Sequence, residues 1–207
     1  MHEFELINNY FLKLANKSKS SLNLNDDVFF DEKNKLVVSV DTYVYKNHFL
    51  NFNRPDLVIK KIIRSSLSDI ICKGVKPKYY FLSGAGNKKF FTKNNLAKIT
   101  NSLKEEQNKY NIILGGGDTV YSNKLSFTVM MVGFSKKIIY RNKSKLNDDI
   151  YVTGSLGDSF IGLMVLKKKI NINKKLSNYF INKYYKPEIK YSLVENLNKF
   201  ATSSIDL

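Results

Sequence analysis

The sequence predicts an α/β (α+β) fold, because segments with the apolar spacing of helices alternate with short β-branched segments typical of strands. Of the 207 residues, 43% are hydrophobic and 25% are charged, which is close to the globular average and sufficient for a sizeable core. The single cysteine, Cys72, excludes a disulfide framework within the chain. No apolar run approaches the roughly 18 residues that cross a bilayer, and the N-terminus lacks a secretory pattern, so we expect a cytoplasmic protein without membrane contact.

The chain opens with apolar residues at helical spacing, which predict a helix over 3–15. The polar residues 23–27 predict a turn. The β-branched run 35–40, which ends at Asp41, predicts a strand. Strand and helix signals therefore alternate from the start of the chain.

The next helix begins at Pro55, a residue that suits the first turn of a helix. Its apolar stripe continues to Ile71, and Gly74 can occupy the position after its end. A strand at 79–82 and a helix at 96–110 follow. The order of these elements extends the alternation that predicts the fold class.

The second half begins with a buried strand at 111–114 that runs into three glycines, and a longer strand at 125–134. We expect a further strand at 149–153, a helix at 158–166 behind it, and a mostly helical stretch at 177–200. Each of these segments has the composition of the element it predicts.

The polar segment 142–148, rich in lysine and asparagine, is the best candidate for a linker. It predicts a first domain at 1–141 and a second, shorter region at 142–207. A short region with one strand is a poor independent domain, so we expect it to be loosely packed and sensitive to protease.

The formal net charge of +16 raises the possibility of nucleic-acid binding. Arginine, the residue that reads bases and clamps phosphates, occurs only at Arg54, Arg64 and Arg141. The lysines are scattered along the chain, and the joint abundance of Lys, Asn, Ile, Phe and Tyr is typical of an AT-rich genome. We therefore expect a solvated basic surface and no nucleic-acid partner.

The placement of the aspartates is more informative than their number. Asp41 and Asp118 each follow a predicted strand, where open α/β sheets usually bind ligands. Asp69 lies in the last turn of the helix that begins at Pro55, where a carboxylate faces the negative end of the helix dipole. Taken singly, each could also be an ordinary turn or surface residue.

The run Gly115-Gly116-Gly117-Asp118-Thr119 is the sharpest local motif. Three glycines allow the backbone to approach a ligand and to expose N–H groups to an anion, and the carboxylate after them suits a metal ion that bridges phosphates. The spacing matches neither a Walker A loop nor a dinucleotide fingerprint. Aspartates without a set of cysteines and histidines indicate Mg²⁺ rather than zinc, and Cys72 is expected in the core.

A series of short motifs runs along the chain: Phe4-Glu5-Leu6-Ile7, Asp26-Asp27, Ser39-Val40-Asp41-Thr42, Asn47-His48-Phe49, Leu67-Ser68-Asp69, Gly116-Gly117-Asp118-Thr119, the segment 151–158, and Ser204-Ile205-Asp206-Leu207. In this order they resemble the bacterial thiamine-monophosphate kinases, a family in the superfamily of aminoimidazole ribonucleotide synthetase and selenophosphate synthetase. Two of these motifs, Phe4-Glu5-Leu6-Ile7 and Asn47-His48-Phe49, favour this family over its relatives.

The resemblance implies an N-terminal mixed-sheet domain of the aminoimidazole ribonucleotide synthetase type, whose sheet pairs with that of a second subunit in a homodimer. It also implies transfer of the ATP γ-phosphoryl group to thiamine monophosphate, which gives thiamine diphosphate. Such a transfer needs positioning and charge neutralisation, which several Mg²⁺ ions held by aspartates would supply. The acceptor phosphate is already ionised, so no catalytic base is expected.

By position, the resemblance also assigns binding roles to individual residues. The implied magnesium ligands are Asp27, Ser39, Val40 through its backbone, Asp41, Asp69, Asp118 and Asp206. The implied ATP contacts are Gly117, Asp118, Arg141 and Tyr110. His48 would face the phosphate of thiamine monophosphate.

Two departures from the family accompany the resemblance. Asn23-Leu24-Asn25 stand where the family usually has Gly-Ile-Gly, and asparagine tolerates the left-handed backbone of such a turn. The family also continues beyond the motif at 204–207, so we expect an incomplete C-terminal α/β domain and no turnover from this chain alone. Two alternatives remain: another ATP-using synthetase of the superfamily, and an inactive nucleotide-binding module.

Overall fold

The computed structural model describes residues 2–15 and 18–207; Met1, Asn16 and Lys17, which belong to the predicted first domain, lie outside the described residues. The strands are β1 (Phe29–Asp31), β2 (Leu36–Val44), β3 (Pro77–Gly86), β4 (Ile113–Tyr121) and β5 (Ser126–Phe134). The helical elements are α1 (Glu3–Leu6), η1 (Ile7–Phe11), α2 (Leu12–Ala15), η2 (Lys19–Leu24), α3 (Pro55–Cys72), α4 (Lys93–Tyr110), α5 (Asp158–Leu166), α6 (Lys174–Tyr185), η3 (Tyr191–Leu193) and α7 (Val194–Phe200). The α/β class expected from the sequence is confirmed.

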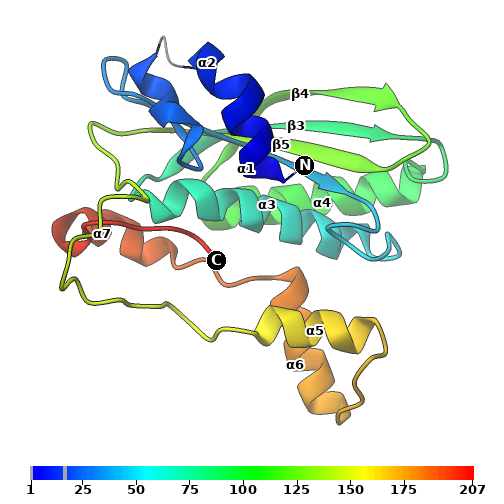
Figure 1. The fold of residues 1–207 in the computed structure, drawn as a ribbon. Coiled ribbons are helices and arrows are strands. Elements are labelled where there is room, and N and C mark those ends of the chain that lie inside the picture. The colour runs from blue at the N-terminus through cyan, green and yellow to red at the C-terminus, as the bar shows by residue number, and fades with distance from the viewer. Residues whose placement is uncertain (1, 16–17) are drawn as a thin grey trace.

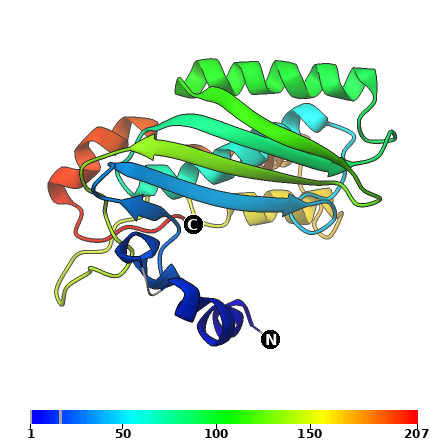
Figure 2. The same ribbon diagram turned by 90° about the horizontal axis from the view of Figure 1, so that it is seen from above.

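The strands form one five-stranded mixed sheet in the order β1-β2-β5-β3-β4. The β3–β4 pair is parallel, and the β1–β2, β2–β5 and β3–β5 pairs are antiparallel. The helices α3 and α4 lie on one side of this sheet (Figure 1), and the view in Figure 2 looks onto the opposite, open face. The two faces therefore have different surroundings.

Helix α3 packs its apolar stripe against the sheet, as its sequence spacing predicts. Ile59, Ile62, Ile63, Leu67 and Ile70 are fully buried there. On its other side, Arg64 forms a buried ion pair with Glu106 of α4, with N–O distances of 2.8 and 2.9 Å. Apolar burial and this charge pair together hold α3 in one orientation, which positions the carboxyl end of the helix.

The open face of the sheet carries large apolar side chains that no described helix covers. Side chains alternate along each strand, so the strand registers place one set of residues on this face. Its exposed apolar members are Phe29, Val40, Ile113, Val120 and Phe134. Several exposed apolar side chains on one open sheet face are typical of an interaction face.

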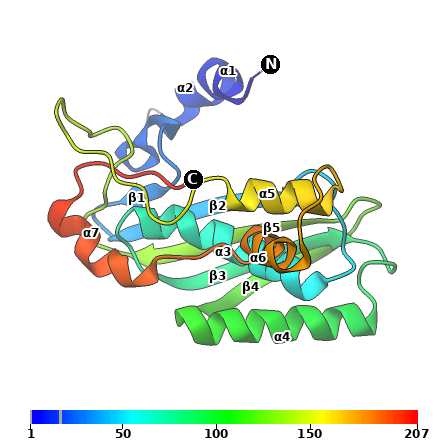
Figure 3. The same ribbon diagram turned by 90° about the horizontal axis from the view of Figure 1, so that it is seen from below.

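The chain after β5 leaves the sheet and forms a helical region. Helices α5 and α6 pack against each other on the far side of α3 from the sheet (Figures 1 and 3). Helix α7 follows, and residues 203–204 return to the sheet domain, where Ser203 Oγ and Ser204 N donate to Tyr140 O. None of the helices in the described residues is long and apolar enough to cross a membrane.

The predicted strand at 149–153 is wrong, because this segment contains neither helix nor strand. Ile150 and Tyr151 are 93% and 85% exposed. A strand needs a neighbour to pair its N–H and C=O groups, and no strand of the described chain lies beside this segment. The predicted helix at 177–200 is interrupted at 186–190, around Pro187. The division into 1–141 and 142–207 stays a prediction.

We expect the first tryptic cuts at Lys143 or Lys145, because the segment 142–157 makes few contacts and its apolar side chains are exposed. Lys60 and Lys61 of α3 are the matched controls, since a helix packed against the sheet must unfold before it is cleaved. Limited proteolysis followed by mass spectrometry gives the order. Cleavage in α3 before cleavage in 142–157 would contradict this view.

Candidate metal and nucleotide site

Carboxylates from four distant parts of the sequence meet near the carboxyl end of α3. Asp26 and Asp27 follow η2, while Asp41, Asp69 and Asp206 come from β2, α3 and the C-terminal segment. One oxygen each of Asp27 and Asp206 lies within 4.8 Å of the other and of Cys72 Sγ. The Asp69 carboxyl is close enough to Asp41 and Asp206 for these two groups to shift its pKa. The fold thus assembles four of the implied metal ligands into one group, which we call the carboxylate cluster: Asp26, Asp27, Asp41, Asp69 and Asp206.

The position of Asp41 follows from the alternation of side chains along β2. Ser39, Asp41 and Tyr43 all point toward α3, because they alternate with residues of the open face. Tyr43 Oη donates to Asp41 Oδ2 at 2.9 Å and shares a 2.9 Å hydrogen bond with Ser66 Oγ of α3. This bridge between β2 and α3 orients the Asp41 carboxylate toward the cluster.

The turn before Asp26 has an unusual backbone. Leu22, Asn23 and Leu24 have φ angles of 52°, 56° and 52°, in the left-handed region. Such a conformation costs roughly 1–2 kcal/mol at a residue other than glycine, and asparagine tolerates it better than leucine. The expectation that asparagine can maintain this turn holds at Asn23. Strain of this kind is often retained where it positions functional groups, and here it precedes Asp26 and Asp27.

The cluster is electrostatically unfavourable without added positive charge. Burial, followed by the charges of Asp41 and Asp206, raises the pKa of Asp69 to about 9. Burial and the charge of Asp27 also raise the pKa of Asp206.

Cys72 lies half-buried beside these groups rather than in the core, which corrects the sequence expectation. Burial raises the pKa of its thiol to about 12, so it stays a neutral and poor metal ligand at neutral pH.

Two basic side chains enter the cluster on the side of Asp26 and Asp27. Lys73 Nζ lies 2.7 Å from Asp26 Oδ1 and 3.0 Å from Asp27 Oδ2. Arg141 donates from its backbone N to Asp26 Oδ2 at 3.0 Å and from Nη1 to Asp27 Oδ1 at 3.2 Å. Burial by itself would lower the pKa of Lys73, but Cys72, Asp26 and Asp27 outweigh it and raise that pKa. Sequence reasoning missed Lys73, whose only signal was its place four residues after Asp69.

The remaining donors suit a hard cation such as Mg²⁺. Ser39 Oγ is buried and has no hydrogen-bond partner within the described residues. It lies two residues from Asp41 on the same side of β2, so an unpaired oxygen stands beside carboxylate oxygens. Mg²⁺ prefers oxygen ligands, and an orphaned hydroxyl oxygen on the same side of β2 as Asp41 fits that preference.

The structure does not bring Asp118 to the cluster. In the strand registers, Asp118 of β4 is paired with Ser83 of β3, which is paired with Thr128 of β5, which is paired with Thr42 of β2. Paired residues share a face, so Asp118 lies on the open face with Thr42. The strands β3 and β5 separate Asp118 from β2. At about 4.8 Å between strands, that separation is roughly 14 Å. Its Oδ1 accepts a 2.8 Å hydrogen bond from Thr119 N.

The strand expected at 111–114 extends further than predicted, to Tyr121, so Gly115, Gly116 and Gly117 lie inside β4. They serve the pairing of β4 with β3: a Cβ on Gly117 would lie 1.8 Å from Leu82 O, and one on Gly115 would lie 2.8 Å from the Phe81 ring. Close strand approach, rather than a phosphate loop, accounts for glycine at these positions.

His48 lies near the cluster, whereas Tyr110 is buried elsewhere. His48 follows β2, its Nδ1 accepts from Val44 N at 2.9 Å, and its ring stands edge-on to Tyr43, the partner of Asp41. Tyr110 ends α4 and packs on Tyr191, and its buried Oη has no partner within the described part of the chain. The implied roles of His48 and Tyr110, like that of the Val40 backbone, stay predictions.

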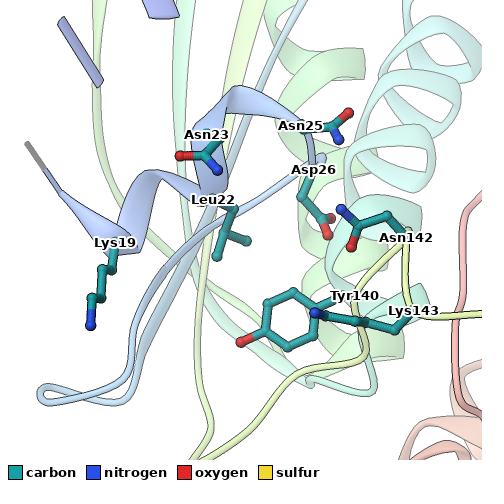
Figure 4. A pocket seen from close by; sticks show the side chains of 8 residues that line it. All are labelled: Lys19, Leu22, Asn23, Asn25, Asp26, Tyr140, Asn142 and Lys143. Carbon is teal, nitrogen blue, oxygen red and sulfur yellow. The ribbon is translucent and has the colours of Figure 1, made fainter. Parts of the chain in front are cut away.

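A pocket of about 250 Å³ opens beside the cluster (Figure 4). Its lining consists of Lys19, Leu22, Asn23, Asn25, Asp26, Tyr140, Asn142 and Lys143. Two ammonium groups, three amides and one aromatic ring suit an anionic ligand that has a planar part. The pocket shares Asp26 with the cluster, so a ligand bound here would lie beside the cluster.

Comparison with known proteins gives independent findings. Residues 25–135 match the family model of the AIR synthase related protein, N-terminal domain. The chain is 37% identical over 214 residues to a thiamine-monophosphate kinase of Buchnera aphidicola from Acyrthosiphon pisum, covering 99% of this chain and 65% of the relative. It is 32% identical to the Escherichia coli K12 protein of the same name, covering 99% of this chain and 64% of the relative. The chain thus spans about 65% of the length of the curated relatives it matches.

Solved structures agree with these sequence matches. The crystal structure of thiamine monophosphate kinase from Aquifex aeolicus superposes with a TM-score of 0.82 at 25% identity, covering 98% of this chain and 68% of that chain. AaThiL complexed with AMPPCP and TMP superposes with a TM-score of 0.86 at 26% identity, covering 97% of this chain and 64% of that chain.

We expect Asp69→Asn to raise the melting temperature in EDTA at neutral pH by roughly 2–6 °C. With its raised pKa, Asp69 must take up a proton when the chain folds, whereas the amide is neutral in both states and can still donate a hydrogen bond. The same substitution should abolish the further rise that Mg²⁺ produces in the unmodified protein. Asp149→Asn, at an exposed position outside the cluster, is the control. Scanning calorimetry with and without MgCl₂ measures both effects, and an Mg²⁺ response in Asp69→Asn equal to that of the unmodified chain would refute the assignment.

Proposed function

Since the chain belongs to the AIR synthase related family, in its thiamine-monophosphate kinase branch, we propose that it acts in the ATP-dependent phosphorylation of thiamine monophosphate to thiamine diphosphate. The observation that carries this proposal is the convergence of Asp27, Asp41, Asp69 and Asp206 near the carboxyl end of α3, with the unpaired Ser39 Oγ on the same side of β2 as Asp41. A set of oxygen donors fits a magnesium-assisted transfer between two phosphate-bearing substrates.

The proposed role of the chain is binding, orientation and charge balance. Asp41, Asp69, Asp206 and Ser39 would hold Mg²⁺, which when bound neutralises the charge on the transferring phosphoryl group. Tyr43 keeps the Asp41 carboxylate in place through its 2.9 Å hydrogen bond. No general base is required, because the acceptor phosphate of thiamine monophosphate is already ionised.

The substrates can be assigned to opposite sides of the cluster. The pocket beside Asp26 and the Arg141 guanidinium offer positive charge, amides and the Tyr140 ring, which supports ATP on that side. His48, edge-on to Tyr43, supports the phosphate of thiamine monophosphate on the side of Asp41. Both assignments are part of the proposal.

We further propose that the protein works as a homodimer that closes the open face of the sheet. Five large apolar side chains lie exposed on this face, and burying them against a second copy would remove an apolar surface from water. The proposed ligands Gly117 and Asp118 lie on the edge strand of the same sheet, and Tyr110 ends the helix before it. A partner chain on the open face would therefore lie close to Asp118.

The unpaired Cys72 fits a reducing compartment such as the cytoplasm.

The kinase proposal predicts Mg²⁺-dependent ATP binding that Asp69→Asn weakens by at least roughly tenfold, since one of the proposed ligands is lost. Calorimetric titration of Mg-ATP measures the affinity, and Asp149→Asn should bind as the unmodified chain does. Formation of thiamine diphosphate from ATP and thiamine monophosphate, followed by chromatography, tests the reaction itself. Mg-ATP binding without product is the result that an incomplete C-terminal domain predicts, and it would restrict this chain to the nucleotide-binding part of the reaction. Absence of both binding and product would overturn the proposal.

The dimer proposal predicts twice the chain mass by light scattering at micromolar concentration. Val40→Glu, on the open face, should shift the protein to monomer, because it places a charge within the apolar interface. Leu96→Glu is the matched control, since Leu96 is an exposed apolar residue of α4 away from the open face. A monomeric unmodified chain, or equal effects of both substitutions, would contradict the proposal.

A further inference from the structure

Lys73 is a fully buried lysine whose ammonium group has three partners. Nζ contacts Asp26 Oδ1 at 2.7 Å, Asp27 Oδ2 at 3.0 Å and Ser204 O at 3.3 Å. The contacts to Asp27 and Ser204 are hydrogen bonds and the contact to Asp26 is an ion pair, so oxygen atoms surround the ammonium group. A buried charge is tolerated only with such compensation, and this arrangement therefore sets Lys73 apart from the many surface lysines of the chain.

The three contacts join parts of the chain that lie far apart in sequence. Lys73 follows the last residue of α3, Asp26 and Asp27 follow η2, and Ser204 belongs to the C-terminal segment. Ser204 is also held from its other side, because its N donates to Tyr140 O at 3.2 Å. Two residues further on, Asp206 enters the cluster. Lys73 thus helps to hold the segment that supplies one of the proposed metal ligands.

Lys73 and Arg141 between them occupy both oxygens of Asp27, since Nη1 of Arg141 lies 3.2 Å from Asp27 Oδ1. Asp26 is likewise committed, to Lys73 through Oδ1 and to the Arg141 backbone N through Oδ2. The cluster carboxylates that form no ion pair in the described residues are Asp41, Asp69 and Asp206, although the charge of Lys73 partly counteracts the burial that raises the pKa of Asp206. The cluster therefore has one side paired directly with basic side chains and one side without an ion pair.

We propose that Lys73 is a built-in counter-cation of the carboxylate cluster: it supplies on the Asp26–Asp27 side the positive charge that a divalent ion supplies on the side of Asp41, Asp69 and Asp206, and it anchors the 203–206 segment to the site. Lys73 is a positioning residue in this scheme and touches no substrate. Its charge-balancing role stands on the contacts alone, whereas the division of labour with a divalent ion rests on the proposed magnesium site.

The test compares melting temperatures of the full chain in EDTA. Lys73→Met keeps the length of the side chain and removes its charge, and we expect a fall of roughly 6–20 °C because carboxylates lose a buried partner. Lys73→Arg should recover at least half of that loss. Lys76→Met is the matched control, because Lys76 forms an exposed ion pair with Glu195 away from the cluster, and we expect a change of less than about 4 °C.

A second substitution separates charge from packing. Asp27→Asn should lower the melting temperature of the unmodified chain, because its amide N–H₂ would face the Lys73 ammonium. In the Lys73→Met background it should raise the melting temperature, because it removes an uncompensated charge while its remaining oxygen still accepts from Arg141. The expected result of the double-mutant cycle is therefore that the change in melting temperature caused by Asp27→Asn has opposite signs in the two backgrounds. Equal losses in both backgrounds, or no recovery in Lys73→Arg, would overturn the counter-cation role.

Titration with MgCl₂ then tests the division of labour. We expect Mg²⁺ to raise the melting temperature of Lys73→Met by more than that of the unmodified chain, because a second cation can now enter beside Asp27. Equal shifts would overturn the division while leaving the results in EDTA intact. If Mg²⁺ moves neither protein, the proposed magnesium site fails, and the EDTA comparison still decides the role of Lys73. If Lys73→Met folds only with MgCl₂, the counter-cation role is supported directly.

Discussion

The placement of several carboxylates in one partly buried volume is the constraint on which the site depends. Each charge loses hydration on burial and repels its neighbours, so the group can persist only with matching positive charge or bound protons. Lys73 and Arg141 provide matching positive charge at Asp26 and Asp27. The raised pKa of Asp69 indicates that positive charge is insufficient on the side of Asp41, Asp69 and Asp206. A site with this imbalance is suited to a cation that arrives with its phosphate ligand.

Helix α3 converts this constraint into geometry. Its apolar stripe holds it on the sheet and the Arg64–Glu106 pair holds it on α4, so its carboxyl end has little freedom. That end presents Asp69 and Lys73, of which the lysine complements the negative end of the helix dipole while the aspartate opposes it. The unfavourable placement of Asp69 is thus offset by a neighbour four residues away, a compensation that is common where function requires a locally unfavourable residue.

The two faces of the sheet divide the implied ligands. Alternation along β2 places Ser39 and Asp41 toward α3 and Val40 on the open face. Asp118 shares that open face, on the edge strand. Ligands on opposite faces of one sheet cannot meet within a single chain, because the backbone of the sheet lies between them. In the proposed homodimer, assembly rather than direct contact would link the chemistry on the α3 side to the apolar surface on the open side.

The sequence alone determined the α/β alternation, the buried stripe of α3 and the aspartates that form the cluster, because periodicity and residue chemistry are local properties. Tertiary structure alone decided that Gly115–Gly117 pair with β3 rather than form a loop, and that 149–153 has no strand to pair with. It also decided which lysine, among many, lies buried between Asp26 and Asp27. Strand pairing and charge compensation depend on groups distant in sequence, so only the folded chain shows which partners meet.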